Sequence, residues 1–175
     1  MTHSGPIRLA DLRRLAAIVG QASGEGESGA FDCLGLCLAD DDYRNASTPL
    51  NSRTFAYTGV DGVHFGLVAL PDRPESEWPV VETCPMDFSA QHIIAGKNLR
   101  DFLELGVSAR SFHLTIAGPA DDEPDMAPGV EELRKLAILR EHFGLKDRTD
   151  HEEWGRELQV RYRGLLELGP GAIFE

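Results

Sequence analysis

The chain has 175 residues, of which 42% are hydrophobic and 26% charged, and its formal net charge at pH 7 is −12. A chain of this length can bury a substantial core, and we expect one domain over residues 1–175. The acidity argues against nucleic acid and membranes as partners, because their anionic surfaces attract Lys and Arg. Residues 21–128 hold eighteen acids and six bases, so the excess negative charge falls in predicted loops and strands.

The cysteines Cys33, Cys37 and Cys84 are odd in number and contain no Cys-x-x-Cys pair. This usage is typical of reduced thiols in a cytosol rather than of a disulfide framework. The N-terminus shows no apolar signal segment, and no apolar run approaches the length of a membrane span. We therefore expect a cytoplasmic protein that does not associate with membranes.

The first twenty residues predict an amphipathic helix, because apolar side chains recur at helical spacing over residues 7–19. Gly20 is the expected end of this helix. Residues 21–30 are rich in Gly, Ser and Glu and predict a flexible loop. The short apolar run 31–38 fits either a helix or a strand, and it is followed by the charged run 40–42.

Residues 54–70 carry the clearest β-strand pattern in the chain. Phe55 and Tyr57 alternate with smaller or polar residues, which predicts a strand with one buried face. Residues 63–70 predict a second strand with apolar side chains on both faces. The intervening Gly59–Gly62 connection permits the positive φ of a tight reversal, so we expect a β-hairpin.

Two further strands and a helix are expected after the hairpin. Residues 79–85 predict a strand bounded by prolines, and residues 92–95 predict its return partner. Asn98 is the expected N-cap of a helix over residues 99–105, which Gly106 would end.

The C-terminal part is expected to be mainly helical. Residues 108–117 allow a strand or a helix, and we favour the helix. Residues 119–128 predict an exposed acidic loop, and residues 130–143 a helix that ends at Gly144. A capping-box pattern at residues 149–152 predicts the start of a last helix, which buries Trp154, Leu158, Tyr162, Leu165 and Leu166.

This order of elements predicts the α+β class. We expect an antiparallel β-sheet in the middle of the chain, packed by an N-terminal helix and by C-terminal helices.

Polar residues do not form a recognisable catalytic or metal motif. His64, His92, His113 and Cys84 lack the spacing of metal ligands, so we expect no metal, no cofactor and no catalytic set. One alternative is a small hydrolase or transferase in which His64 works with Asp61 or Cys84. Another is a scaffold subunit whose helices over residues 131–168 form an oligomer interface; the sequence does not give the oligomeric state.

Three segments together resemble the core of the SUKH superfamily: Phe55–Phe65, Pro79–Met86 and Asn98–Gly106. In that family a strand with a small-residue turn precedes further strands and an Asn-led helix that carries a Phe-Leu pair. The family's N-terminal Leu-Gly-x-x-Leu-Pro segment is matched only in part, because Leu34–Ala39 lacks the proline.

The resemblance implies an α+β, non-enzymatic immunity protein that neutralises a toxin, often a nuclease, by stoichiometric binding. An acidic surface suits this role because it steers association with a basic partner protein. The candidate contact residues are His64 and seven acids in predicted loops: Asp40, Asp41, Asp42, Asp61, Asp121, Asp122 and Asp125.

Overall fold

The computed structural model describes residues 5–39, 43–87, 89–112, 128–149 and 151–170. Within these ranges the α-helices are α1 (Leu9–Ser23), α2 (Gly26–Gly29), α3 (Leu99–Ala109), α4 (Val130–Phe143) and α5 (His151–Tyr162). The strands are β1 (Cys37–Leu38), β2 (Ser52–Tyr57), β3 (His64–Val68), β4 (Val80–Thr83) and β5 (His92–Gly96). Short 3₁₀ helices are η1 (Asp32–Leu34), η2 (Glu75–Glu77) and η3 (Arg163–Leu165).

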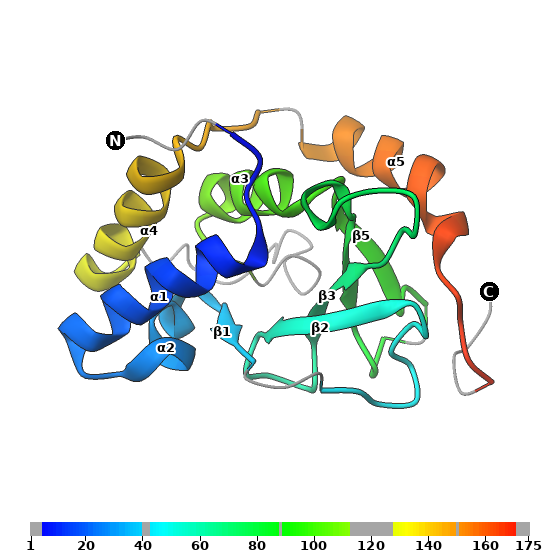
Figure 1. The fold of residues 1–175 in the computed structure, drawn as a ribbon, viewed down its shortest axis with the longest axis horizontal. Coiled ribbons are helices and arrows are strands. Elements are labelled where there is room, and N and C mark those ends of the chain that lie inside the picture. The colour runs from blue at the N-terminus through cyan, green and yellow to red at the C-terminus, as the bar shows by residue number, and fades with distance from the viewer. Residues whose placement is uncertain (1–4, 40–42, 88, 113–127, 150, 171–175) are drawn as a thin grey trace, which may run out of the picture.

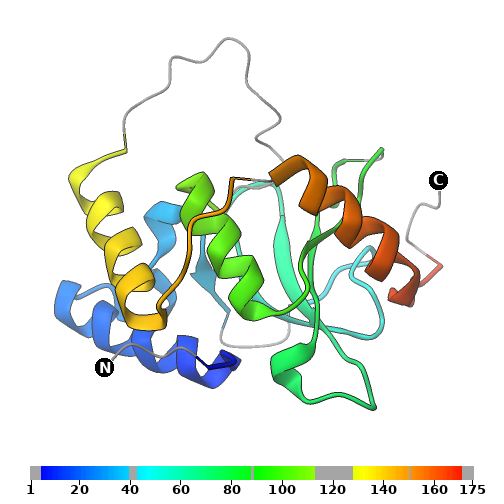
Figure 2. The same cartoon turned by 90° about the horizontal axis from the view of Figure 1, so that it is seen from above.

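The strands of the described chain form an antiparallel sheet in the order β1-β2-β3-β4-β5, so each strand pairs with its neighbour in sequence. Helix α1 precedes the sheet, and α3, α4 and α5 follow it. This arrangement confirms the predicted α+β class. In Figures 1 and 2, α1, α2 and α4 gather at one end of the molecule and α5 lies at the other, with α3 and the sheet between them.

The predicted hairpin is present as β2 and β3, which are joined by residues 58–63. Gly59, Asp61 and Gly62 have φ values of 83°, 50° and 70°. Glycine adopts this left-handed conformation without steric cost, and Asp tolerates it better than most residues. The Thr58 backbone N–H donates to the carbonyl of Val63 (3.0 Å), which closes the loop. The connection is therefore a hydrogen-bonded turn.

The prediction that Tyr57 shares a buried face with Phe55 is wrong. A bulge between Thr54 and Ala56 shifts the register of β2 against β3, so Phe55 and Ala56 are both fully buried. The extra residue reverses the alternation beyond it. Tyr57 consequently reaches the surface at the end of the strand.

The main hydrophobic core combines one face of the sheet with α1, α3 and α4. Phe102 of α3 is fully buried at its centre. Its ring contacts those of Phe55, Phe65 and Phe112, at centroid distances of 5.9, 4.9 and 5.1 Å. Aromatic rings bury a large apolar area and add specific edge and tilted contacts, so this group stabilises the packing of α3 on the sheet.

Helix α5 covers part of the opposite face with a smaller apolar cluster, composed of Trp154, Leu158 and Tyr162 over Val68, Val81 and Ile94. Gln159 adds a polar contact, because its side-chain amide accepts from the Ile94 N–H (2.9 Å) and donates to the Ile94 carbonyl (3.0 Å). The side chain satisfies the outer edge of β5 as a further strand would. Leu165, predicted to be buried here, is largely exposed in η3.

Two predicted helix ends are wrong because the glycines concerned serve packing inside the helix. Helix α1 continues beyond Gly20, where an added Cβ would lie 1.8 Å from the Gly26 carbonyl oxygen. Helix α3 continues beyond Gly106, where an added Cβ would lie 2.1 Å from the Phe112 ring. Residues 21–30, predicted as a loop, contain the end of α1 and all of α2.

Other local predictions are confirmed or completed by the structure. The Asn98 side chain caps α3 by accepting the Asp101 N–H (2.9 Å), and α4 ends at Gly144 with a φ of 60°. The ambiguous run 31–38 contains both η1 and β1. The segment 108–117 is described only as far as residue 112, and its first two residues belong to α3.

Candidate functional site

A row of buried polar side chains crosses the sheet on the face that α5 partly covers. His64, Thr83 and His92 are register neighbours on β3, β4 and β5, so their side chains share one face. All three are buried. This face is therefore apolar where α5 covers Val68, Val81 and Ile94, and polar where His64, Thr83 and His92 lie side by side.

Both histidines are held by consecutive residues of the loop before β2. His64 donates from Nδ1 to the Gly62 carbonyl (2.8 Å), so its Nε2 accepts from the Thr48 hydroxyl (3.0 Å). His92 donates from Nε2 to the Ser47 carbonyl (2.6 Å). Burial lowers the pKa of both imidazoles below the ordinary histidine value. They are mainly neutral at pH 7 and serve as structural hydrogen-bonding groups.

The hydrolase or transferase alternative requires His64 to act with Cys84 or Asp61, and the structure pairs it with neither. The Cys84 N–H extends the β4 ladder by donating to the Gln91 carbonyl (2.9 Å), so the Cys84 side chain points away from the face of His64. Its Sγ lies 3.9 Å from Oε1 of Glu82 on that other face. Asp61 is exposed in the turn, and both His64 nitrogens have partners.

Most predicted contact residues lie outside the described residues. These are Asp40, Asp41, Asp42, Asp121, Asp122 and Asp125. Two residues of other predictions also lie outside the described residues: His113, and Asp150 of the predicted capping box. Of the other two candidates, Asp61 is exposed, whereas only 1% of His64 is exposed. Asp61 is available to a partner on the surface, and the His64 side chain is not.

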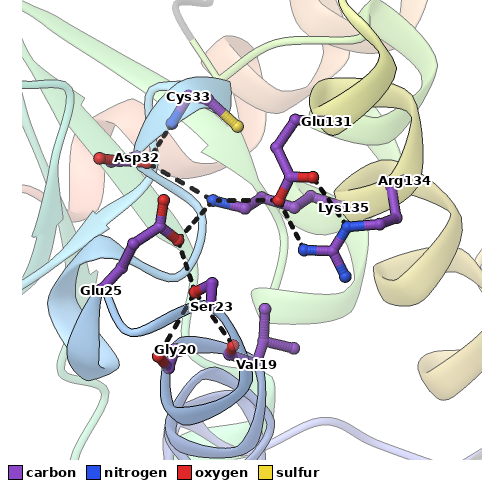
Figure 3. Close-up of polar contacts among 9 residues, drawn as sticks. All are labelled: Val19, Gly20, Ser23, Glu25, Asp32, Cys33, Glu131, Arg134 and Lys135. Carbon is purple, nitrogen blue, oxygen red and sulfur yellow. Dashed lines mark hydrogen bonds and ion pairs between the residues drawn. The ribbon is translucent and has the colours of Figure 1, made fainter.

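A second polar cluster, which the sequence analysis did not identify, surrounds Lys135 of α4 (Figure 3). The Lys135 side chain is 1% exposed, and its Nζ lies 2.9 Å from Glu25 Oε2, 3.6 Å from Asp32 Oδ1 and 3.9 Å from Glu131 Oε1. Carboxylates around a buried ammonium compensate for its lost hydration. Because they come from the start of α2, η1 and α4, the cluster ties α4 to the N-terminal part of the chain.

This cluster serves to hold α4 in place by ion pairs, and Lys135 is not prepared to act as a nucleophile. Burial by itself lowers the pKa of Lys135, but the hydrogen bond to Glu25 and the nearby negative charges raise it on balance. A lysine nucleophile requires the opposite change, toward a neutral amine. Burial also raises the pKa of Cys33, which lies beside the cluster in Figure 3, and thereby disfavours its reactive thiolate.

An open pocket of about 560 Å³ lies where β1 meets the turn between β2 and β3. Its lining residues are Ser28, Leu38, Ala39, Tyr43, Tyr57, Gly59, Val60, Gly62 and Val63. Tyr43, Tyr57 and Val60 are 44%, 39% and 45% exposed. Exposed aromatic and large apolar side chains around one hollow are typical of protein-binding surfaces. We call these three residues and their hollow the aromatic pocket.

His64 of the buried polar row contacts two residues that line the aromatic pocket, Tyr43 and Gly62. The Tyr43 ring meets the His64 imidazole edge-on, with centroids 5.4 Å apart and an interplanar angle of 82°. Gly62, which accepts the His64 Nδ1–H, also lines the pocket. Sequence reasoning missed Tyr43 because it follows the acidic run 40–42 within a predicted loop. Its only signal was an aromatic side chain among polar neighbours.

No family model, curated protein or solved structure matches this chain. The resemblance to the SUKH superfamily accordingly stays a prediction. No helix in the described part of the chain has both the length and the apolar character needed to cross a membrane. Among the same residues, no group of three or more His, Cys, Asp or Glu side chains is placed to hold a metal ion. Cys33, Cys37 and Cys84 form no disulfide with one another.

Proposed function

We propose that this protein is a non-enzymatic binding module of the SUKH immunity type, which neutralises a basic toxin by stoichiometric binding in the cytoplasm. The observation that carries the proposal is the aromatic pocket. It exposes Tyr43, Tyr57 and Val60 together, and among the described residues its lining contains no histidine, cysteine or carboxylate. Such a lining suits the anchoring of a partner side chain rather than acid–base or nucleophilic chemistry.

The charge of the chain favours a basic partner for this pocket. Asp61 lies in the turn between the pocket residues Val60 and Gly62, and the acidic run 40–42 directly precedes Tyr43 in sequence. Tyrosines supply large contact area with little loss of side-chain freedom, and surrounding acids accelerate encounter with a positive surface. A cationic side chain entering the pocket would meet aromatic faces as well as negative charge.

The proposal is tested with the wild-type protein as bait in a lysate of its own host at low salt, and with Tyr57→Ala as a matched bait. Any protein retained is identified, purified and titrated against the wild type. We expect a basic partner with one-to-one stoichiometry, loss of its toxicity on co-expression, and at least tenfold weaker binding to Tyr57→Ala. Val160→Ala, at an exposed position of α5, is the control and should bind as wild type.

Ionic strength gives a second readout of the same complex. The Debye length falls from about 10 Å at 0.1 M salt to about 3 Å at 1 M, so the association rate should fall steeply and the dissociation rate much less. Reversing the charges of Asp121, Asp122 and Asp125 should act in the same direction. A partner that binds Tyr57→Ala and wild type equally would exclude the aromatic pocket, and association rates independent of salt would exclude electrostatic steering.

A further inference from the structure

A second pocket, of about 550 Å³, lies between the C-terminal part of α3, helix α4 and the segment that leads to α5. Its lining includes the arginines Arg110, Arg140 and Arg148 beside Ser108, Val107 and Leu133. Three guanidinium groups from three separate segments thus line one pocket of an acidic chain, which suggests a binding role. We call this hollow the arginine pocket.

Two of the three guanidinium groups are already fixed in place. Arg148 pairs with Asp101 (Nη2 to Oδ1, 2.5 Å), and its guanidinium carbon lies 4.5 Å from the ring centroid of Trp154. Arg140 pairs with Asp147 (2.5 Å). Ordering these long side chains in advance removes part of the entropy that a ligand would otherwise have to overcome.

Two of the arginines, Arg110 and Arg140, retain donor capacity. Arg110 is exposed, and no carboxylate within the described ranges pairs with it. The Nε–H of Arg140 is buried and has no hydrogen-bond partner among the described residues. Asp147 is the acid among the described lining residues, so the guanidinium groups outnumber the carboxylate. With Asp101, which pairs with Arg148, counted as well, the described groups named here are three guanidinium groups and two carboxylates, in a chain that carries −12.

We infer that the arginine pocket binds a small organic oxyanion, a carboxylate or phosphate attached to a short apolar body. Guanidinium groups present their N–H donors in a planar fork that matches the oxygens of both headgroups. Val107, Leu133 and Leu136 provide apolar lining for the body of the ligand. The volume lies within the range of small-molecule pockets, about 300–1,000 Å³. This site is independent of the proposed partner binding at the aromatic pocket.

The experiment is a titration of the full-length protein with inorganic phosphate and, separately, with succinate, followed by backbone amide NMR at constant ionic strength. We expect saturable shifts at the amides of Val107, Ser108 and Arg110. The headgroup that binds more tightly identifies the ligand class. Arg110→Gln and Arg140→Gln should each weaken that binding at least fivefold, whereas Arg156→Gln, on the exposed side of α5, should leave it unchanged.

Thermal melting of each variant separates loss of binding from loss of folding. Arg110→Gln removes an exposed side chain and should melt with the wild type, so it decides the test even if Arg140→Gln is less stable. Shifts that increase linearly without saturation for both anions would overturn the inference. Equal affinities in wild type, Arg110→Gln and Arg156→Gln would overturn it as well.

Discussion

The two faces of the sheet differ in how they are covered. The face toward α1, α3 and α4 is packed with interlocking aromatic rings centred on Phe102. The face toward α5 carries a small apolar cluster and, farther along the same strands, the neutral pair His64 and His92. The first face holds the fold together, while the second tolerates a polar layer that fixes the wall of the aromatic pocket.

The largest expected difference between the two faces is in the free energy of unfolding that is lost when a buried side chain is truncated to alanine. Phe102→Ala should lower the free energy of unfolding by about 3–5 kcal/mol, because it removes a fully buried ring that contacts three others. Leu158→Ala on the α5 face should lower it by about 2 kcal/mol, at the low end for leucine, because its cluster is small. Urea unfolding of both variants measures the difference, and equal losses would contradict the comparison.

A matched pair of glycines sharpens the same contrast. Gly106→Ala places a Cβ against the Phe112 ring and should destabilise the protein by about 1–3 kcal/mol through overpacking. At Gly155 in α5 an added Cβ meets no atom of the described residues within 4 Å, so Gly155→Ala should stabilise the protein by about 0.5–1 kcal/mol through higher helix propensity. Thermal melts followed by circular dichroism compare the two, and the same sign for both would contradict the assigned packing.

The smallest expected effect is a pH dependence confined to the α5 face. His64 and His92 have folded-state pKa values lowered by burial from 6.5. Above pH 6.5 both histidines are mainly neutral in the folded and in the unfolded chain, so their contribution to the free energy of unfolding is complete. This contribution is lost as the pH falls from 6.5 toward the folded-state pKa, because the histidines of the unfolded chain take up protons first. The loss is at most about 1.4 kcal/mol per histidine for each pH unit.

Unfolding of wild type and of His92→Gln at pH 7.5 and pH 5.5 measures this dependence. The double variant with His64→Gln should show the flattest pH dependence, because neither position then titrates. Arg44 and Arg163, whose positive charges lie near His64 and His92, also disfavour protonation in the folded state. A double variant that loses as much stability as wild type on acidification would assign the dependence to other groups.

Local patterns were sufficient to predict β2, β3, β4, β5 and most of the helices, whereas β1 lies in a run that fitted either a helix or a strand. Residues 92–95 and 130–143 carry periodic apolar side chains or terminal glycines, which report on the element that contains them. The class α+β followed from the order of these elements. The hairpin of β2 and β3 was predicted, but the full strand order was not, because the apolar period of a strand reports on its own faces and does not identify its partner.

Which side of an element is buried was harder to predict. In α4 the apolar side chains at helical spacing include Val130 and Leu133, both of which are exposed. The buried face instead contains Lys135, because Glu25 and Asp32 on other elements neutralise it there. No pattern within residues 130–143 could reveal those partners.

The candidate surface was missed for a related reason. The bulge after Thr54 brings Tyr57 to the aromatic pocket, and the alternation of residue types in the sequence was interpreted as a regular strand without a bulge. The acids chosen from sequence were selected for their place in loops, and only Asp61 among them is described next to the pocket residues.

The contact between Gln159 and Ile94 has a consequence for biosynthesis. Ribosomes make α5 after β5, so β5 is synthesised well before the Gln159 side chain that satisfies the N–H and carbonyl of Ile94. Until then a nascent chain presents an unpaired strand edge, which neighbouring nascent chains on the same messenger can join. Synthesis of α5 is thus the step that covers the β5 edge of the sheet at Ile94 against other copies.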